Sequence, residues 1–100
     1  MTKIFFERTG GFMGRKVSVT IDLDDLPAEQ VELLDELLDN ADFFELPPDL
    51  TKAAMPDSFT YNITVSSVER QHSVRVSDAT APDDLRPLLE ELSKQARTRR

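Results

Sequence analysis

The sequence predicts an α+β fold: a four-stranded antiparallel sheet with two helices packed on one face, in the order β-β-α-β-β-α. Segment 58–66 alternates apolar and polar side chains without interruption, which is typical of a strand with one buried and one wet face. Segments 27–40 and 82–92 carry apolar stripes at helical spacing, which can cover the buried face. Three further segments repeat the alternation less completely: 3–8, 16–23 and 71–77.

The first two strands are expected to form a hairpin. Segment 3–8 places Ile4 and Phe6 on one face and Phe5 on the other. Segment 16–23 alternates Val, Ile and Leu with Ser, Thr and Asp. Because the connection between them is short and rich in glycine, antiparallel pairing is predicted.

This connection holds every glycine of the chain. Glycine permits a positive φ and a close backbone approach, so it belongs in turns. Two large apolar residues lie among the glycines, and they either fold back beneath the sheet edge or face a partner. The segment is the first candidate for partner binding, and its residues are Gly10, Gly11, Phe12, Met13 and Gly14.

The first helix is bounded by recognisable signals. Pro27 suits the first helical position, where its missing N–H does no harm. Glu29 in the first turn suits the helix dipole, and Asn40 is a plausible end. The apolar stripe consists of Val31, Leu34, Leu37, Leu38 and Ala41.

Segment 41–57 connects the first helix to the third strand. Phe43, Phe44 and Leu46 are expected to plug one end of the core. Segment 49–57 holds no clear period, which predicts a loop with at most one helical turn near 51–54. Its length makes it the second candidate for a functional loop. The partner-binding residues predicted in it are Asp49, Lys52 and Met55.

The second half repeats the order strand, strand, helix. Segments 58–66 and 71–77 are expected to pair as a hairpin. Pro82 is expected to open the last helix, with Pro87 tolerated near its start. The residues expected to be buried together are Val17, Val19, Ile21, Val31, Leu34, Leu38, Phe59, Tyr61, Ile63, Val65, Val74, Val76, Leu85, Leu88, Leu89 and Leu92.

Length and charge bound the class of protein. One hundred residues make one domain, expected over 1–96, with a basic tail at 97–100 that is either solvated or an electrostatic contact. The net charge of −7 argues against nucleic acid and against an anionic membrane surface. The initial apolar run is too short for a signal peptide, and no stretch reaches transmembrane length, so a cytoplasmic protein is expected. A monomer is assumed, although an edge strand, the first or the fourth, is able to pair with a partner.

No set of residues indicates catalysis, a metal site or a cofactor. The chain has no cysteine and a single histidine, His72, in the apolar register of a strand. A satisfied, partly buried histidine is the favoured interpretation, and a general base or metal ligand is the alternative. Asp22, Asp24 and Asp25 resemble the start of a calcium loop, but Leu26 and the absent glycine break the pattern. We therefore expect a protein that is not an enzyme.

Five motifs, in order and with compatible spacing, resemble the emfourin family. They are ERTGGF at 7–12 with Gly14, ADFFELP at 41–47, PDSFTYNITV at 56–65, HSVRV at 72–76, and LRPLL at 85–89 with Pro82. Emfourins are small cytoplasmic proteins that inhibit thermolysin-like zinc metallopeptidases such as protealysin. The resemblance implies reversible inhibition, with the peptidase's active-site cleft blocked. A catalytic zinc keeps an open position, which an inhibitor carboxylate or carbonyl can occupy.

The sequence therefore indicates two candidate functions. The first is inhibition of a thermolysin-like zinc metallopeptidase, with segment 10–14 as the main contact and 49–57 as the second. Such enzymes favour a large apolar residue just after the scissile bond, and Phe12 after Gly11 offers that shape. The alternative is a binding or regulatory module that does not inhibit. Hydrolysis of a peptide substrate in the presence of the protein separates the two functions.

Overall fold

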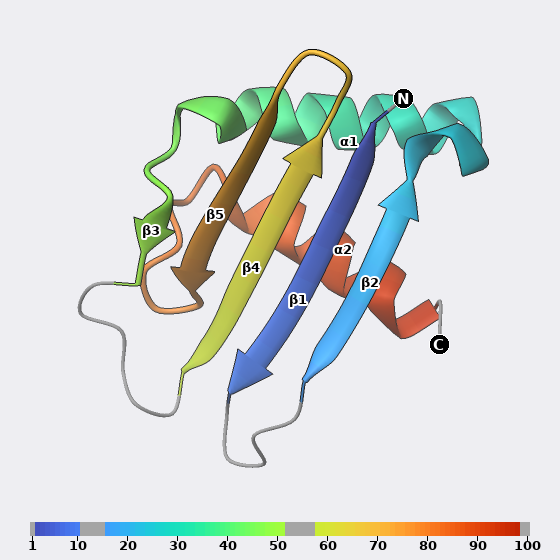
Figure 1. Cartoon of the computed structure of the whole chain (residues 1–100). Helices are drawn as coiled ribbons and strands as arrows, with labels where there is room; N and C mark the ends of the chain where they lie inside the picture. The colour runs from blue at the N-terminus through green and yellow to red at the C-terminus, as the bar shows by residue number, and fades with distance from the viewer. Residues whose placement is uncertain (1, 11–15, 52–57, 99–100) are drawn as a thin grey trace.

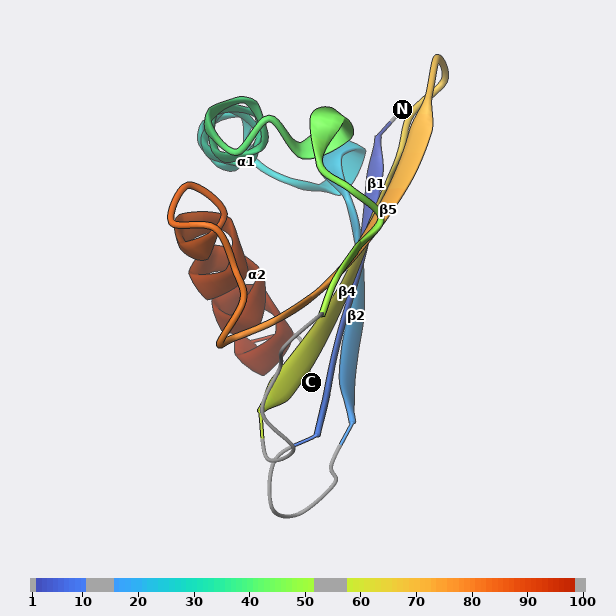
Figure 2. The same cartoon turned by 90° about the vertical axis from the view of Figure 1, so that its left-hand side faces the viewer.

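The computed structural model describes residues 2–10, 16–51 and 58–98 as two layers, a sheet and a pair of helices (Figure 1). The sheet has the strand order β2-β1-β4-β5-β3. Both helices lie on one face of it, and the described residues place no helix on the other face (Figure 2). In chain order the elements are β1 (Lys3–Gly10), β2 (Val17–Asp22), η1 (Leu23–Asp25), α1 (Ala28–Asn40), η2 (Phe43–Glu45), β3 (Asp49–Leu50), β4 (Phe59–Ser66), β5 (Gln71–Ser77) and α2 (Arg86–Thr98).

The α+β class and the one-sided helix layer are confirmed, but the sheet is larger than predicted. Asp49 and Leu50 form a short fifth strand, β3, which runs parallel to β5. The N–H of Arg75 also donates to the carbonyl of Pro48 at 2.9 Å. The prediction of a loop is wrong for these two residues because a two-residue strand is too short to show a period of two. The helical turn predicted near 51–54 lies outside the described residues, except for Thr51.

The position of the edges also differs from the expectation. β1 pairs antiparallel with both β2 and β4, so it lies inside the sheet. β2 is one edge, and the two-residue β3 covers part of β5 at the other. The prediction that the first strand forms an edge is therefore wrong, because β4 returns to pair beside β1.

The core lies between the sheet and the two helices. Ile4 and Phe6 of β1 are buried as predicted, and Phe5 lies on the opposite face. Phe43 closes one end of the core, with Phe44 and Leu46 partly buried against it. Eleven members of the predicted core are buried: Ile21, Leu34, Leu38, Ile63, Val65, Val74, Val76, Leu85, Leu88, Leu89 and Leu92.

The remaining predicted core residues lie at its margin. Four are only partly buried against the core: Val17, Val19, Val31 and Tyr61. Phe59 is 37% exposed, so its predicted burial is wrong. It is the first residue of β4, at an end of the sheet that extends beyond the helices (Figure 2).

Both helices begin later than predicted. Pro27 is the N-cap of α1 and lies one residue before the helix, which ends at Asn40 as expected. α2 begins at Arg86 instead of Pro82, after a turn in which the Leu85 N–H donates to the Pro82 carbonyl at 3.0 Å. A helix begun at Pro82 would need an N–H from Pro87, which proline lacks. As the second residue of α2, Pro87 does not need to donate a hydrogen bond within the helix.

Candidate functional site

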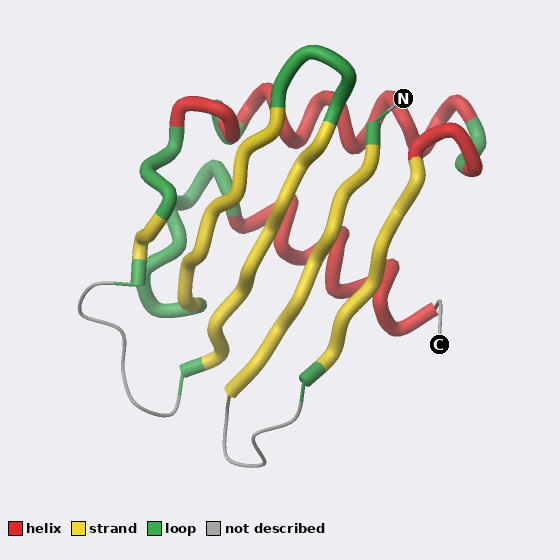
Figure 3. The backbone as a smooth tube through the Cα atoms, viewed as in Figure 1, coloured by secondary structure: helices red, strands yellow, loops and turns green. Residues whose placement is uncertain are grey.

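The two segments predicted to bind a partner are joined to the same end of the sheet. β1 and β3 end there, and β2 and β4 begin there (Figure 3). Of the predicted contact residues, the structure describes Gly10 and Asp49. The others lie outside the described residues: Gly11, Phe12, Met13, Gly14, Lys52 and Met55. We call the described residues Arg8, Gly10, Phe59 and Tyr61 the loop end.

Gly10 holds the last position of β1 in a conformation that other residues rarely adopt. Its φ is +102°, and it lies opposite Phe59 in the β1–β4 register. A Cβ atom at this position would lie 2.7 Å from the carbonyl oxygen of Ser58. Both the positive φ and the close approach of the neighbouring strand therefore require glycine here. Segment 10–14 thus starts from a defined backbone position beside β4.

Phe59, which is exposed, and Arg8, which is partly buried, form an aromatic and cationic pair at the loop end. The Arg8 guanidinium carbon lies 5.0 Å from the centroid of the Phe59 ring, within the range of a cation–π contact. Further into the sheet, Tyr61 stacks on Phe6 with ring centroids 5.8 Å apart. Phe59 is not recognisable as a surface residue from the alternation of β4, which places it on the core-facing side. Its position as the first residue after a long loop was the available signal.

An open groove of about 740 Å³ adjoins the loop end on the helix side. Arg8, Tyr61 and Asp78 line it from the sheet side, and Arg86 and Leu89 line it from α2. Burial raises the pKa of the Tyr61 phenol, and the negative charge of Asp78 adds to this shift. Tyr61 is thus a neutral phenol in the lining of the groove.

Asp49 is exposed, and its carboxylate is held by Thr51. The oxygen Oδ1 accepts hydrogen bonds from the Thr51 hydroxyl and from the Thr51 N–H, the latter at 2.9 Å. These bonds lower the pKa of Asp49 below its usual value, and the bond from the Thr51 hydroxyl contributes most. Asp49 is thus a fixed anion at the start of the second candidate segment.

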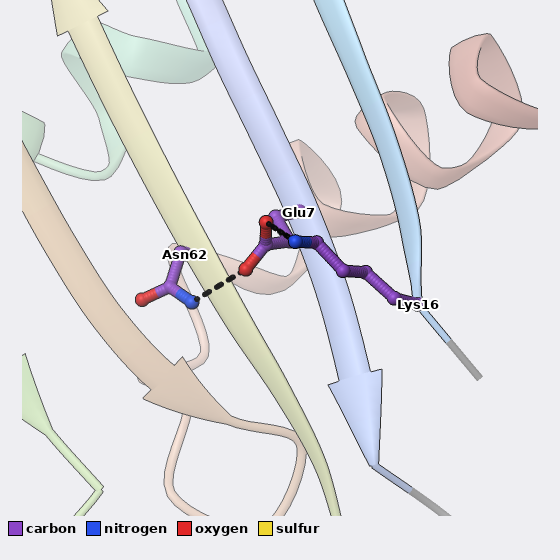
Figure 4. Close-up of polar contacts among 3 residues, drawn as sticks. All are labelled: Glu7, Lys16 and Asn62. Carbon is purple, nitrogen blue, oxygen red and sulfur yellow. Dashed lines mark hydrogen bonds and ion pairs between the residues drawn. The ribbon is translucent and has the colours of Figure 1, made fainter. Parts of the chain in front are cut away.

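A polar bridge braces the bare face of the sheet near the loop end (Figure 4). The Glu7 carboxylate lies 3.3 Å from the Lys16 ammonium through Oε2. Its other oxygen accepts a hydrogen bond from the Asn62 amide at 3.4 Å. The bridge links Lys16, which precedes β2, to β1 and β4, so it supports the strands that carry the loop end.

His72 is a satisfied, partly buried residue far from the loop end in the fold. Its Nε2 lies 2.7 Å from the Leu46 carbonyl oxygen, which can only accept, so this nitrogen carries the proton. Its ring meets Phe43 edge to face, with centroids 5.6 Å apart. Among the described residues, no group of three or more His, Asp or Glu is placed to hold a metal ion. In the same part of the chain no helix is long and apolar enough to cross a membrane.

Comparison with known proteins gives one match. A protein family described as Emfourin matches residues 6–93, which include the loop end and both candidate segments. No curated protein and no solved structure matches the chain.

Proposed function

Since this chain belongs to the emfourin family, we propose that it reversibly inhibits a thermolysin-like zinc metallopeptidase, with the loop end of its sheet blocking the active-site cleft. Inhibition of metallopeptidases is the role that the family implies. The kind of target and the contact surface are the parts that the following observations support.

The observation that carries the proposal is the shared attachment of the two candidate segments. Gly10 lies directly opposite Phe59, so segments 10–14 and 49–57 adjoin neighbouring positions of one hydrogen-bonded sheet. A scaffold that holds its contact segments by their ends lowers the conformational entropy lost on binding. The positive φ of Gly10 adds a defined direction to the start of the first segment.

Phe59 and Arg8 supply the kind of side chains that anchor protein interfaces. Aromatic and arginine residues are enriched among interface residues that contribute most to affinity. Phe59 is 37% exposed although it lies on the core-facing side of the sheet. We expect its ring to be covered by the peptidase, with Arg8 retained at its side.

Charge at the start of the second candidate segment suits a metal-containing cleft. A catalytic zinc keeps one position open for water or substrate, and an inhibitor oxygen can take it. Asp49 is an exposed carboxylate whose hydrogen bonds keep it ionised. The net charge of −7 favours approach to a cationic centre.

The test is hydrolysis of a peptide substrate by a thermolysin-like enzyme in the presence of this protein. The expected result is reversible inhibition that rises with inhibitor concentration and weakens as substrate is raised, because both compete for one cleft. Binding without loss of hydrolysis would favour the alternative of a non-inhibitory module. Absence of binding to enzymes of this class would contradict the proposal.

The contribution of segment 10–14 is tested separately with Phe12→Ala. If Phe12 is an interface anchor, inhibition weakens by about 2 kcal/mol or more at nearly unchanged stability. If Phe12 instead closes the core, the free energy of unfolding falls by about 3–5 kcal/mol and each folded molecule still inhibits. The second outcome would move the main contact to 49–57.

A further inference from the structure

β2 is an edge strand whose outer side has no neighbour in the described part of the chain (Figure 1). It is six residues long, whereas the opposite edge is partly covered by β3. An edge strand presents a row of backbone N–H and C=O groups that another strand can pair with. Which residues present those groups follows from the hydrogen bonds to β1.

One hydrogen bond at the end of the β1–β2 ladder identifies which residue pairs of the two strands are hydrogen-bonded. The Leu23 N–H donates to the Thr2 carbonyl at 3.0 Å, in the same register that places Ile4 opposite Ile21. Hydrogen-bonded and non-bonded pairs alternate along an antiparallel ladder. The backbone groups of Val17, Val19, Ile21 and Leu23 therefore point toward β1. Those of Ser18, Thr20 and Asp22 point outward.

The sequence KVSVTID at 16–22 is chemically symmetric about its centre, Val19. If two copies of β2 pair antiparallel about this centre, apolar residues lie opposite apolar residues and hydroxyl residues lie opposite hydroxyl residues. The positive charge at one end lies opposite the negative charge at the other. The outward-pointing residues then oppose one another, so this register can form its hydrogen bonds. The opposed pairs are Lys16 with Asp22, Ser18 with Thr20, Val17 with Ile21, and Val19 with itself.

We propose that this protein self-associates through β2, with two copies joined antiparallel about Val19 into one continuous sheet. Lys16 and Asp22 form a cross-strand ion pair twice in such a dimer, and opposite charges directly across strands stabilise pairing. The Lys16 side chain is 64% exposed on the bare face, so its ammonium, which lies 3.3 Å from Glu7, is also accessible to a second copy. Val17 and Val19 are only partly buried in the single chain, and pairing covers them further.

The charges favour this register over its neighbours. A shift of one residue opposes outward-pointing groups with inward-pointing ones and removes the hydrogen bonds. A shift that centres the pair on Thr20 sets Lys16 against Asp24, which lies in η1 beyond the end of the strand. The centre at Val19 is thus the register in which both charged residues at the strand ends find partners. The net charge of −7 per chain opposes association, so a weak dimer is expected.

The first test measures the mass of the intact chain by sedimentation from micromolar to millimolar concentration. The expected result is a reversible monomer–dimer equilibrium, together with slower hydrogen exchange of the Ser18 and Thr20 amides at high concentration. A protein that stays monomeric at millimolar concentration overturns the proposal. Protection of these amides on addition of a peptidase, without self-association, overturns it as well and assigns the edge to that partner.

Thr20 offers a matched pair of variants. Thr20→Pro removes an outward N–H without removing a bond to β1, and proline is tolerated at sheet edges. It should abolish the dimer, whereas Thr20→Ala keeps the N–H and should retain it. Equal dimerisation of the two variants overturns pairing through β2.

Charge reversal tests the register. Lys16→Asp and Asp22→Lys should each weaken the dimer by about tenfold or more, because two attractions become two repulsions. An equimolar mixture of the two variants should form a heterodimer, in which both ion pairs are restored. Lys94→Asp changes the net charge as Lys16→Asp does but lies on α2, and it is the control. A Lys16→Asp protein that dimerises as the unaltered chain does overturns the register.

Discussion

Phe59 and Phe5 are two phenylalanines with nearly equal exposure, 37% and 38%, on opposite faces of the sheet. Phe59 lies at the loop end on the core-facing side, opposite Gly10. Phe5 lies on the bare face between Thr20 and Thr64 of the neighbouring strands. Alanine variants at the two positions each lose an equally exposed aromatic ring. A difference in their inhibition is therefore due to the position of the ring.

Phe59→Ala is predicted to weaken inhibition of the peptidase by about 2 kcal/mol, roughly 30-fold, because the proposed function makes the ring an interface anchor. Phe5→Ala is predicted to leave the inhibition constant unchanged. Inhibition constants are compared at equal concentrations of folded protein, with folding checked by circular dichroism. Equal loss in the two variants, or none in Phe59→Ala, would remove Phe59 from the interface.

Tyr61 reports the environment at the loop end through its ionisation. Its pKa is raised above the usual value of 10.0 by burial first and by Asp78 second. A raised pKa in the folded state means that the neutral phenol contributes stability below pH 10, and that this contribution is lost as pH rises through the folded pKa. Because it is the only tyrosine of the chain, the phenolate absorbance gives its titration directly.

The folded protein should therefore titrate at a higher pH than the chain in urea. Asp78→Asn should move the folded midpoint down, since it removes a nearby negative charge. A folded midpoint at or below that of the unfolded chain would show that the Tyr61 phenol is not buried in the folded protein.

At the scale of elements, His72 joins η2 to β5. Its Nε2 donates to the Leu46 carbonyl at 2.7 Å, and its ring packs against Phe43 and Phe44. This contact closes the end of the core that lies away from the loop end. The hydrogen bond confirms the sequence-based interpretation of a satisfied histidine.

His72→Gln is predicted to lower the free energy of unfolding by about 1–2 kcal/mol, since glutamine keeps a donor but loses the ring contacts. Inhibition by the folded variant should be unchanged. Chemical denaturation and an inhibition assay on the same preparation measure both quantities. A large loss of inhibition at unchanged stability would assign His72 to the functional site instead.

At the scale of the whole molecule, β4 is the centre of the packing. Ile63 is fully buried and lies between Phe6 of β1 and Val74 of β5. The neighbouring residue Thr64 points to the bare face, where its hydroxyl meets that of Ser73 at 2.8 Å. Adjacent residues of one strand thus face two different environments.

Ile63→Ala is predicted to lower the free energy of unfolding by about 2–5 kcal/mol, through lost burial and the cavity left behind. Thr64→Ala should cost less than about 1 kcal/mol, because its partner is exposed to water. Urea denaturation of the two variants measures the difference. A cost below about 0.5 kcal/mol for Ile63→Ala would contradict the assignment of faces along β4.

Elements with purely local evidence can be identified from the sequence alone. The alternation around Ile63 identified β4 and its two faces because side chains of a strand alternate with a period of two. The spacing of Leu34 and Leu38 identified α1 for the corresponding helical reason. The glycine at position 10 indicated a turn that needs a positive φ, and Gly10 has one. The five sequence motifs also indicated the emfourin family, and the family match over residues 6–93 confirms this.

Features that depend on neighbours distant in the chain can be seen only in the folded molecule. β3 exists because β5 offers it backbone partners, and two residues carry no pattern of their own. β2 became the edge because β4 takes the other side of β1. Phe59 continues the core-facing alternation of β4, yet its ring is exposed because the helices do not reach that end of the sheet. Periodicity states which way a side chain points, and only the packed molecule determines whether anything lies there to cover it.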